Sequence, residues 1–262
     1  MNLNLSGKQA LVCGSSEGIG KATAEELARM GASITLIARR SEKLAKLCKE
    51  LNTSAGQKHQ YLTADFDDTI ALEGVMREHL AAGNQYQILI NNTGGPPGGP
   101  AHEAGMDEYL LAFRRHLIAN QLLVRQLLPG MKEAQWGRII NVISTSVKAP
   151  LPNLGVSNTV RGAVANWAKT LATELGPFNI TVNNVLPGAT KTQRLDSIIA
   201  KKAEKSGSTE KETAEKMTAQ VPLRRFAEAS EVADGIAFLA SPAGGYINGI
   251  NLPVDGGRLP TL

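Results

Sequence analysis

The stretch that decides the fold is Gln9-Ala10-Leu11-Val12-Cys13-Gly14-Ser15-Ser16-Glu17-Gly18-Ile19-Gly20. It begins with an apolar run that predicts a strand, and a helical pattern then runs from Ile19 to Met30 and closes at Gly31. The glycines between them permit a tight turn and a close approach to a ligand. Backbone N–H groups at the start of such a helix can hold a pyrophosphate. The stretch therefore predicts a dinucleotide-binding turn, although a glycine turn alone serves equally often as a plain connection.

Strand and helix patterns alternate along the rest of the chain. Strands are expected at 33–38, 60–64, 87–92, 138–143, 180–186 and 250–254, and helices at 42–51, 71–82, 156–175 and 231–239, with a further long helical stretch that ends near 131. Apolar strands separated by helices indicate a parallel sheet covered on both faces. We therefore expect an α/β fold, a Rossmann-type doubly wound parallel sheet of about seven strands. Residues 1–262 should form a single domain, since no linker divides them.

One segment departs from this alternation. Residues 193–220 are rich in lysine and glutamate, have helical propensity and follow the strand expected at 180–186. In an open α/β sheet, a segment that follows the carboxyl end of a strand overlies the ligand crevice. The position predicts a mobile lid at 190–220 that also determines substrate identity. A pair of solvated surface helices is the alternative.

Composition narrows the classes of partner. The net charge is +4, but the cations alternate with acids, as in 40–43 and 201–205, which is typical of a solvated surface. Aromatic residues make up 4% of the chain, so platforms for base stacking are scarce. No apolar run is long enough to span a bilayer, and the N-terminus lacks a secretory pattern. We expect a cytoplasmic protein that binds neither nucleic acid nor membrane.

Short motifs follow the glycine turn in a fixed order. They are Asp65, Asn91-Asn92-Thr93-Gly94, Gly137-Arg138-Ile139-Ile140 with Ser144, Pro187-Gly188, and Val254-Asp255-Gly256-Gly257. In this order, from about Leu5 to Gly257, the chain resembles the short-chain dehydrogenase/reductase family, and most of all its 3-oxoacyl-acyl-carrier-protein reductases. The resemblance implies a nicotinamide cofactor, no metal, a small carbonyl or alcohol substrate and a homotetramer. It places the cofactor contacts at Gly14, Ser15, Ser16, Gly18, Ile19, Gly20, Arg39, Arg40, Asp65, Asn92, Gly94, Arg161, Pro187 and Gly188.

The end of the second expected strand bears on which nicotinamide cofactor is used. An acid there would bind the ribose hydroxyls of NAD, whereas a cation suits the 2′-phosphate of NADP. Arg39 and Arg40 offer cations and no acid, and Arg39 can bind a phosphate in bidentate geometry. Glu17 points the other way, because NADP-dependent members often carry a basic residue at that position. We expect NADP rather than NAD.

The catalytic pattern of the family is not present in full. A tyrosine thirteen residues after the strand serine normally donates a proton, and a lysine one turn later lowers its pKa. Counting from Ser144 reaches Ser157 and then Arg161. An alkyl hydroxyl is a far weaker acid than a phenol. Arg161 keeps a cation on the same helix face, where it could bind ribose oxygens, but it cannot pass protons.

The place of the family's active-site asparagine is taken by His116, with Asn120 one turn further on. A histidine titrates near neutrality, so His116 is a candidate substitute acid beside Ser144. The alternative is a histidine whose hydrogen bonds are satisfied within the fold. The candidate catalytic residues are thus Ser144, His116, Ser157 and Arg161.

Three functions remain open from the sequence. The first is an NADP-dependent oxidoreductase that acts on a 3-oxoacyl-like carbonyl through an atypical proton relay. The second is a catalytically inactive NADP-binding sensor or regulatory subunit. The third is a lyase or isomerase that uses the same pocket without net redox change.

Overall fold

Strand β1 (Gln9–Cys13) lies inside a parallel sheet, between β2 (Ser33–Ala38) and β4 (Ile88–Asn91). The computed structural model describes residues 1–261, and its seven strands follow the order β3-β2-β1-β4-β5-β6-β7. The remaining strands are β3 (Gln60–Thr63), β5 (Gly137–Val142), β6 (Ile180–Pro187) and β7 (Asn251–Val254). The order reverses between β1 and β4, as in a doubly wound sheet. The predicted Rossmann-type fold is confirmed.

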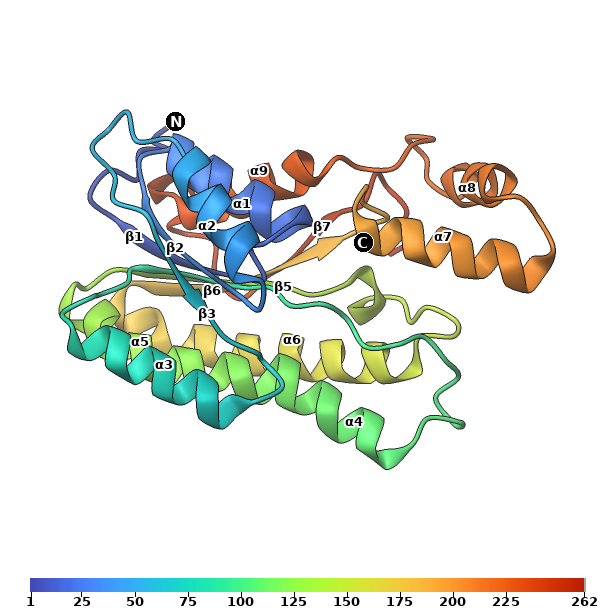
Figure 1. Cartoon of the computed structure of the whole chain (residues 1–262), viewed down its shortest axis with the longest axis horizontal. Coiled ribbons are helices and arrows are strands. Elements are labelled where there is room, and N and C mark those ends of the chain that lie inside the picture. The colour runs from blue at the N-terminus through green and yellow to red at the C-terminus, as the bar shows by residue number, and fades with distance from the viewer. Residues whose placement is uncertain (262) are drawn as a thin grey trace.

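Helices cover both faces of this sheet (Figure 1). One layer holds α1 (Gly18–Arg29), α2 (Ser41–Glu50) and α9 (Ala229–Ala240), and the other holds α3 (Thr69–Ala81), α5 (Ala119–Glu133) and α6 (Gly155–Leu175). Alternate side chains of β1 enter opposite cores, since Ala10 and Val12 pack with the first layer and Leu11 and Cys13 with the second. Burial on both faces explains why the strands are apolar without alternation.

The long helical stretch expected before residue 131 is divided into three parts. Helix α4 (Met106–Phe113) leads into a π-helical turn at Arg114–Ile118, and α5 follows. A π-turn accommodates one extra residue per turn and is frequent at functional sites. Here it buries His116 and lets its neighbour Arg115 line a cleft. Hydrophobic spacing alone does not reveal such a turn, because the residues on either side keep the helical period.

The segment expected as a lid forms α7 (Gln193–Ser206) and α8 (Glu210–Ala219). Both helices lie beyond the end of the sheet, near β7 (Figure 1). Helix α7 buries Leu195, Ile199 and Ala203, which share one face of the helix. The helical propensity is confirmed, and the mobility stays a prediction. None of the helices in residues 1–261 is long and apolar enough to cross a membrane.

A row of four asparagines, three of them buried, crosses four neighbouring strands. Asn91 Nδ2 donates to Asn141 Oδ1, Asn141 Nδ2 to Asn184 Oδ1, and Asn184 Nδ2 to Asn251 Oδ1, each over 2.9 Å. The four residues also pair by backbone register. A slip of one residue would turn these polar side chains to the other face of the sheet. The row therefore fixes where β4, β5, β6 and β7 end relative to one another.

This row gives a prediction for stability. Asn141→Ala removes the partner of Asn91 Nδ2 and of Asn184 Oδ1, and should lower the free energy of unfolding by about 2–4 kcal/mol, because each orphaned buried group costs about 1–3 kcal/mol. Urea unfolding measures the loss, and the slope with denaturant should stay constant. Asn251→Ala, at the half-buried end of the row, should cost only about 1 kcal/mol. Equal losses in the two variants would contradict the role of the row.

Candidate functional site

A cleft of about 460 Å³ opens at the carboxyl ends of the strands. It is lined from β1, β2, β4, β5 and β6, from the start of α6 and from the base of α7. The predicted site residues that line it are Gly14, Ser16, Gly18, Ile19, Arg39, Arg40, Asp65, Asn92, Gly94, Ser144, Ser157, Arg161, Pro187 and Gly188. The predicted residues Ser15, Gly20 and His116 do not line it.

The glycine turn packs against the end of β4. A Cβ on Gly14 would stand 2.5 Å from Asn92 O, and a Cβ on Gly20 would stand 2.3 Å from Gly14 O, so any side chain would clash with backbone at either position. Asn92 Nδ2 donates to Cys13 O and Gly14 O, each over 3.3 Å. Gly20 thus acts through the shape of the turn, whereas Gly14 also borders the cleft. The close contact leaves a concave backbone surface that fits a pyrophosphate.

Ser15 was expected to contact the cofactor, but it does not line the cleft. Its side chain is fully buried, and its Oγ accepts a hydrogen bond from Ile37 N over 3.1 Å. The hydroxyl therefore ties the glycine turn to the end of β2 and does not border the cleft. A serine in a glycine-rich turn looks the same in sequence whether it faces the ligand or the neighbouring strand, so the motif could not separate the two.

Positive charge gathers at the end of β2, around one acid. Glu17 pairs with Arg40 over 2.7 Å and with Lys43 over 3.1 Å. Although burial raises the pKa of Glu17, the hydrogen bonds from Arg40 and Lys43 outweigh that effect and hold it below its usual value. Arg39 makes only a 3.9 Å contact with Asp65 and remains exposed. Glu17 is thus occupied by two cations, and Arg39 is left able to meet a phosphate.

Two serines border the inner part of the cleft. Ser144, which follows β5, accepts a hydrogen bond at Oγ from Ser146 N over 3.1 Å. This bond uses one lone pair, so the hydroxyl proton of Ser144 is free to be donated to a ligand oxygen. Ser157, in the first turn of α6, also lines the cleft and is half-buried.

Arg161 is a buried cation at the same place. Its side chain is 8% exposed, Nη1 donates to Val142 O over 3.0 Å, and Nε has no hydrogen-bond partner in the described chain. Burial, and then the nearby charge of Arg194, lower the pKa of Arg161 to about 10. Arg161 therefore stays positively charged at neutral pH. It supports the end of β5 on one side and presents charge to the cleft on the other.

His116 is buried and does not line the cleft. Its Nδ1 shares a hydrogen bond of 2.7 Å with Thr93 Oγ1, and its Nε2 has no partner among the described residues. Burial, followed by the charges of Arg161 and Arg115, lowers the pKa of His116 to about 2. The imidazole is therefore neutral at physiological pH. Neither its place outside the cleft lining nor its charge supports the expected role of substitute acid, which stays untested.

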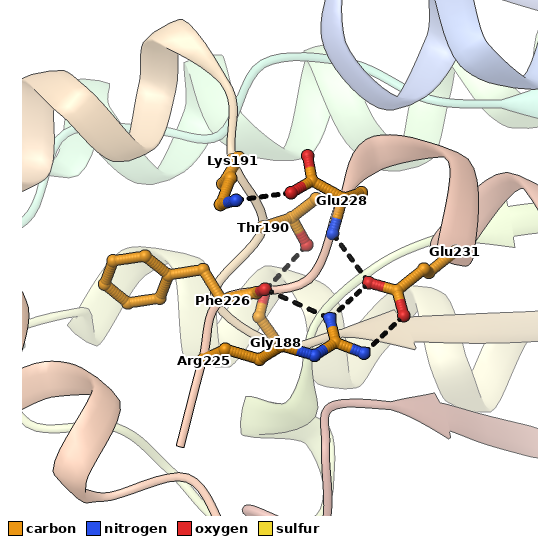
Figure 2. A network of polar contacts seen from close by, with 7 residues as sticks. All are labelled: Gly188, Thr190, Lys191, Arg225, Phe226, Glu228 and Glu231. Atoms are coloured by element: carbon orange, nitrogen blue, oxygen red, sulfur yellow. Dashed lines mark hydrogen bonds and ion pairs between the residues drawn. The ribbon is translucent and has the colours of Figure 1, made fainter. Parts of the chain in front are cut away.

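The segment just before α7 is tied to the start of α9, as Figure 2 shows. Lys191 pairs with Glu228, and Glu228 N donates to Glu231 Oε2 over 2.8 Å. Arg225 binds Glu231 through two 2.6 Å contacts, and this pairing lowers the pKa of Glu231 to about 2. Thr192 Cγ2 lies 3.1 Å from where a Cβ on Gly18 would stand. The start of the expected lid is thus held against both α9 and the glycine turn.

The sequence did not single out two arginines that line the cleft. Arg115 is held by Asp67, with Nε 2.6 Å from Oδ1. Arg194 donates from Nη2 to Pro96 O over 2.9 Å. The signal for Arg194 was its place just inside the expected lid, but helical propensity does not say which side chain turns toward the crevice. Within residues 1–261, no group of three or more His, Cys, Asp or Glu side chains could hold a metal ion.

Comparison with known sequences gives a family match over most of the chain. A family model described as enoyl-(acyl carrier protein) reductase matches residues 14–258. NADPH-dependent reductase BacG of Bacillus subtilis is 26% identical, with 98% of this chain and 100% of BacG covered. The 3-oxoacyl-[acyl-carrier-protein] reductase FabG of Pseudomonas aeruginosa is 32% identical, with 97% of this chain and 98% of that protein covered.

Solved structures agree with this match. L-sorbose reductase from Gluconobacter frateurii, complexed with NADPH and L-sorbose, has a TM-score of 0.93 at 31% identity, with both chains covered in full (100%). YwfH, an NADPH-dependent reductase involved in bacilysin biosynthesis, has a TM-score of 0.92 at 27% identity, with 98% of this chain and 100% of YwfH covered. The cofactor of these proteins is the one that the arginines at the end of β2 led us to expect.

The buried state of His116 predicts a pH dependence of stability. Unfolded His116 binds a proton below about pH 6.5, whereas in the fold its pKa is about 2. Between these values the unfolded chain binds more protons, so the stabilisation is complete above pH 6.5 and is lost as the pH falls below it. The free energy of unfolding should fall by about 1.4 kcal/mol per pH unit from this group.

Urea unfolding of the parent and of His116→Gln at pH 7.5 and pH 5.5 measures this term. The variant should lose about 1 kcal/mol less than the parent between the two pH values, because glutamine does not titrate there. His79, whose pKa is also lowered by burial, is present in both proteins and cancels. Identical losses in parent and variant would show that His116 titrates normally in the fold.

Proposed function

Because this chain belongs to the short-chain dehydrogenase/reductase family, we propose that it is an NADPH-dependent reductase of small carbonyl compounds with an atypical active site. The observation that carries the proposal is that one cleft joins the glycine turn and Arg39 to Ser144, Ser157 and Arg161. A nucleotide held at the first group would have its reactive end near the second. The proposed active site lacks the tyrosine and lysine of the family pattern.

The residues at the two ends of this cleft fit NADPH. The glycine turn presents a backbone surface that a Cβ at Gly14 would destroy, which suits a pyrophosphate. Arg39 and Arg40 would hold the 2′-phosphate, and Asp65 with Asn92 would border the adenosine half. When bound, NADPH supplies a hydride to a carbonyl carbon.

The chain's own residues orient and polarise the carbonyl. Ser144 donates its hydroxyl proton to the carbonyl oxygen, since its Oγ already accepts from Ser146 N. Ser157 offers a second hydroxyl one helical turn before Arg161. Arg161 raises the positive potential around the developing oxyanion, and this effect is strong because the side chain is buried. These interactions stabilise negative charge without a proton transfer by the protein.

The proton then comes from water. Ser157 is too weak an acid, and Arg161 remains protonated at neutral pH. Neutral His116 orders Thr93 beside the cleft through their 2.7 Å hydrogen bond and acts as a positioning residue. Loss of a general acid costs about 10²–10⁴ in rate, so slow turnover remains compatible with this site.

The finer features expected from the resemblance belong to the same proposal. A 3-oxoacyl-like carbonyl is the first substrate class to examine. Exposed apolar side chains at Met106, Leu110 and Leu111 of α4 support assembly through the long helices, as in the expected homotetramer. The cytoplasmic location remains a prediction.

Titration with NADPH, followed by a screen of NADPH-saturated protein for loss of nicotinamide absorbance, tests the proposal. The panel contains a neutral 3-oxoacyl thioester, 2-oxo and 3-oxo acids, and a simple ketone. We expect NADPH binding and steady oxidation with at least one class. Ser144→Ala should lower kcat by about 10-fold to 10³-fold, because an oxyanion donor is lost. NADPH affinity should be unchanged in this variant.

Two outcomes would overturn parts of this proposal. NADPH binding without oxidation by any carbonyl would indicate the inactive nucleotide-binding protein considered from the sequence. Unchanged turnover in Ser144→Ala would remove Ser144 from the reaction. Ser146→Ala is the matched control, since its own hydroxyl is buried and does not line the cleft.

The charge arrangement at the end of β2 predicts opposite effects of two substitutions on cofactor affinity. Arg39→Ala should weaken NADPH binding about tenfold, because a charge-assisted hydrogen bond to the phosphate is lost. Glu17→Gln should tighten NADPH binding several-fold, since Arg40 and Lys43 lose their carboxylate partner. Fluorescence titration with NADPH and NADH measures both. NADH affinity should hardly change, and an equal shift for the two cofactors would contradict the assignment.

A further inference from the structure

The cleft-lining cations fall into two groups by their partners. Arg40 pairs with Glu17, Arg115 with Asp67, and Arg39 lies 3.9 Å from Asp65. Arg161 and Arg194 make no ion pair within the described residues 1–261. Both acids that line the cleft, Glu17 and Asp65, stand beside the arginines at the end of β2. The uncompensated charge therefore gathers at the substrate end.

Arg161 and Arg194 flank one small space beside Gly95. The position that a Cβ on Gly95 would take lies 3.7 Å from Arg161 Nη2 and 3.9 Å from Arg194 Nη2. A side chain there would fill the gap between the two guanidinium groups, and glycine leaves it open. Two cations this close repel each other, and the charge of Arg194 accordingly helps to lower the pKa of Arg161.

Hydrogen bonding also leaves these groups incomplete. Arg161, a side chain more than nine-tenths buried, donates only from Nη1, to Val142 O, so its Nη2 beside Gly95 has no partner within the described residues. Arg194 uses Nη2 for Pro96 O. A buried charge without a partner is costly, whereas a guanidinium and a carboxylate form a short, strong pair. The space is also next to the first turn of α7, where Gln193 and Leu195 line the cleft and the helix dipole favours an anion. All of these features call for an oxyanion.

We propose that Arg161 and Arg194 together bind a carboxylate carried by the substrate, so that the protein reduces small oxo acids in preference to neutral carbonyl compounds. The inference rests on the proposed function for the carbonyl, and it adds the chemical class of the substrate. Arg161, on α6, donates to Val142 O at the end of β5, two residues before Ser144. A carboxylate bound to Arg161 would therefore lie close to Ser144. Ile143, Leu154 and Ile198 line the cleft as well and would contact the apolar part of a short acid.

Binding can be measured without turnover. Acetoacetate and acetoacetamide share the same ketone and nearly the same shape, but only the first is anionic. Calorimetric titration of NADP⁺-saturated protein, which has no hydride to transfer, should show acetoacetate binding at least tenfold more tightly than acetoacetamide. Arg194→Gln should remove most of this preference and leave the affinity for acetoacetamide unchanged, while Arg194→Lys should restore part of it. Arg77→Gln, an exposed arginine of α3 outside the cleft, is the control and should behave as the parent.

Several results would overturn the carboxylate site. These are equal affinities for the acid and the amide, an acid affinity that Arg194→Gln does not change, or displacement of NADP⁺ by acetoacetate, which would assign the two arginines to the cofactor. Tighter binding of inorganic phosphate than of acetoacetate would replace the carboxylate by a phosphate group. A failure of the protein to bind NADPH would overturn the proposed function alone. Acetoacetate is then titrated into the free protein. A loss of acetoacetate affinity in Arg194→Gln but not in Arg39→Ala supports the carboxylate site, and the reverse pattern overturns it.

Discussion

The hydrogen bonds between asparagine side chains across the sheet fix the geometry on which the cleft depends. They join the buried Asn91, Asn141 and Asn184 and the half-buried Asn251 in one row. Because the pairs share a backbone register, the four strands must end at one edge. The next few residues of three of these strands include Asn92, Ser144 and Pro187, and all three border the cleft. An apolar row would bury as well but would specify the register less strictly.

The second constraint is the burial of Arg161. A cation removed from water needs polar partners from the protein or from a ligand. Within the described residues, the Arg161 guanidinium has one hydrogen bond, to the backbone carbonyl of Val142. Burial, and then the charge of Arg161, lowers the pKa of His116, so the residue that titrates near neutrality in water is neutral in the fold. In the site that we propose, Arg161 stands where the family resemblance places a lysine. An arginine there keeps its positive charge beside the cleft and passes no proton.

The two ends of the cleft differ in how their charges are arranged. At the end of β2, arginines lie beside acids, so the positive electrostatic potential is moderate. A phosphate there would bind the arginine that its acid holds only weakly. Near Gly95, two arginines lie close together with no acid beside them among the residues that line the cleft. Their charge is neutralised only by a bound anion. Arg194 reaches this point from the first turn of α7, and Arg161 reaches it from α6.

The sequence by itself determined the doubly wound sheet, because strand and helix periods and the glycine turn are local signals. It also pointed to fourteen of the residues that line the cleft, since residues after parallel strands must meet at one edge. Only the tertiary structure decided the roles of Ser15 and His116, whose side chains turn to β2 and to Thr93. The sequence also did not show that Arg161 and Arg194 lie close together, because the two residues approach each other only in the packed fold. Nor did it show the pKa of a buried group such as Arg161, because that pKa depends on burial and on the charges nearby.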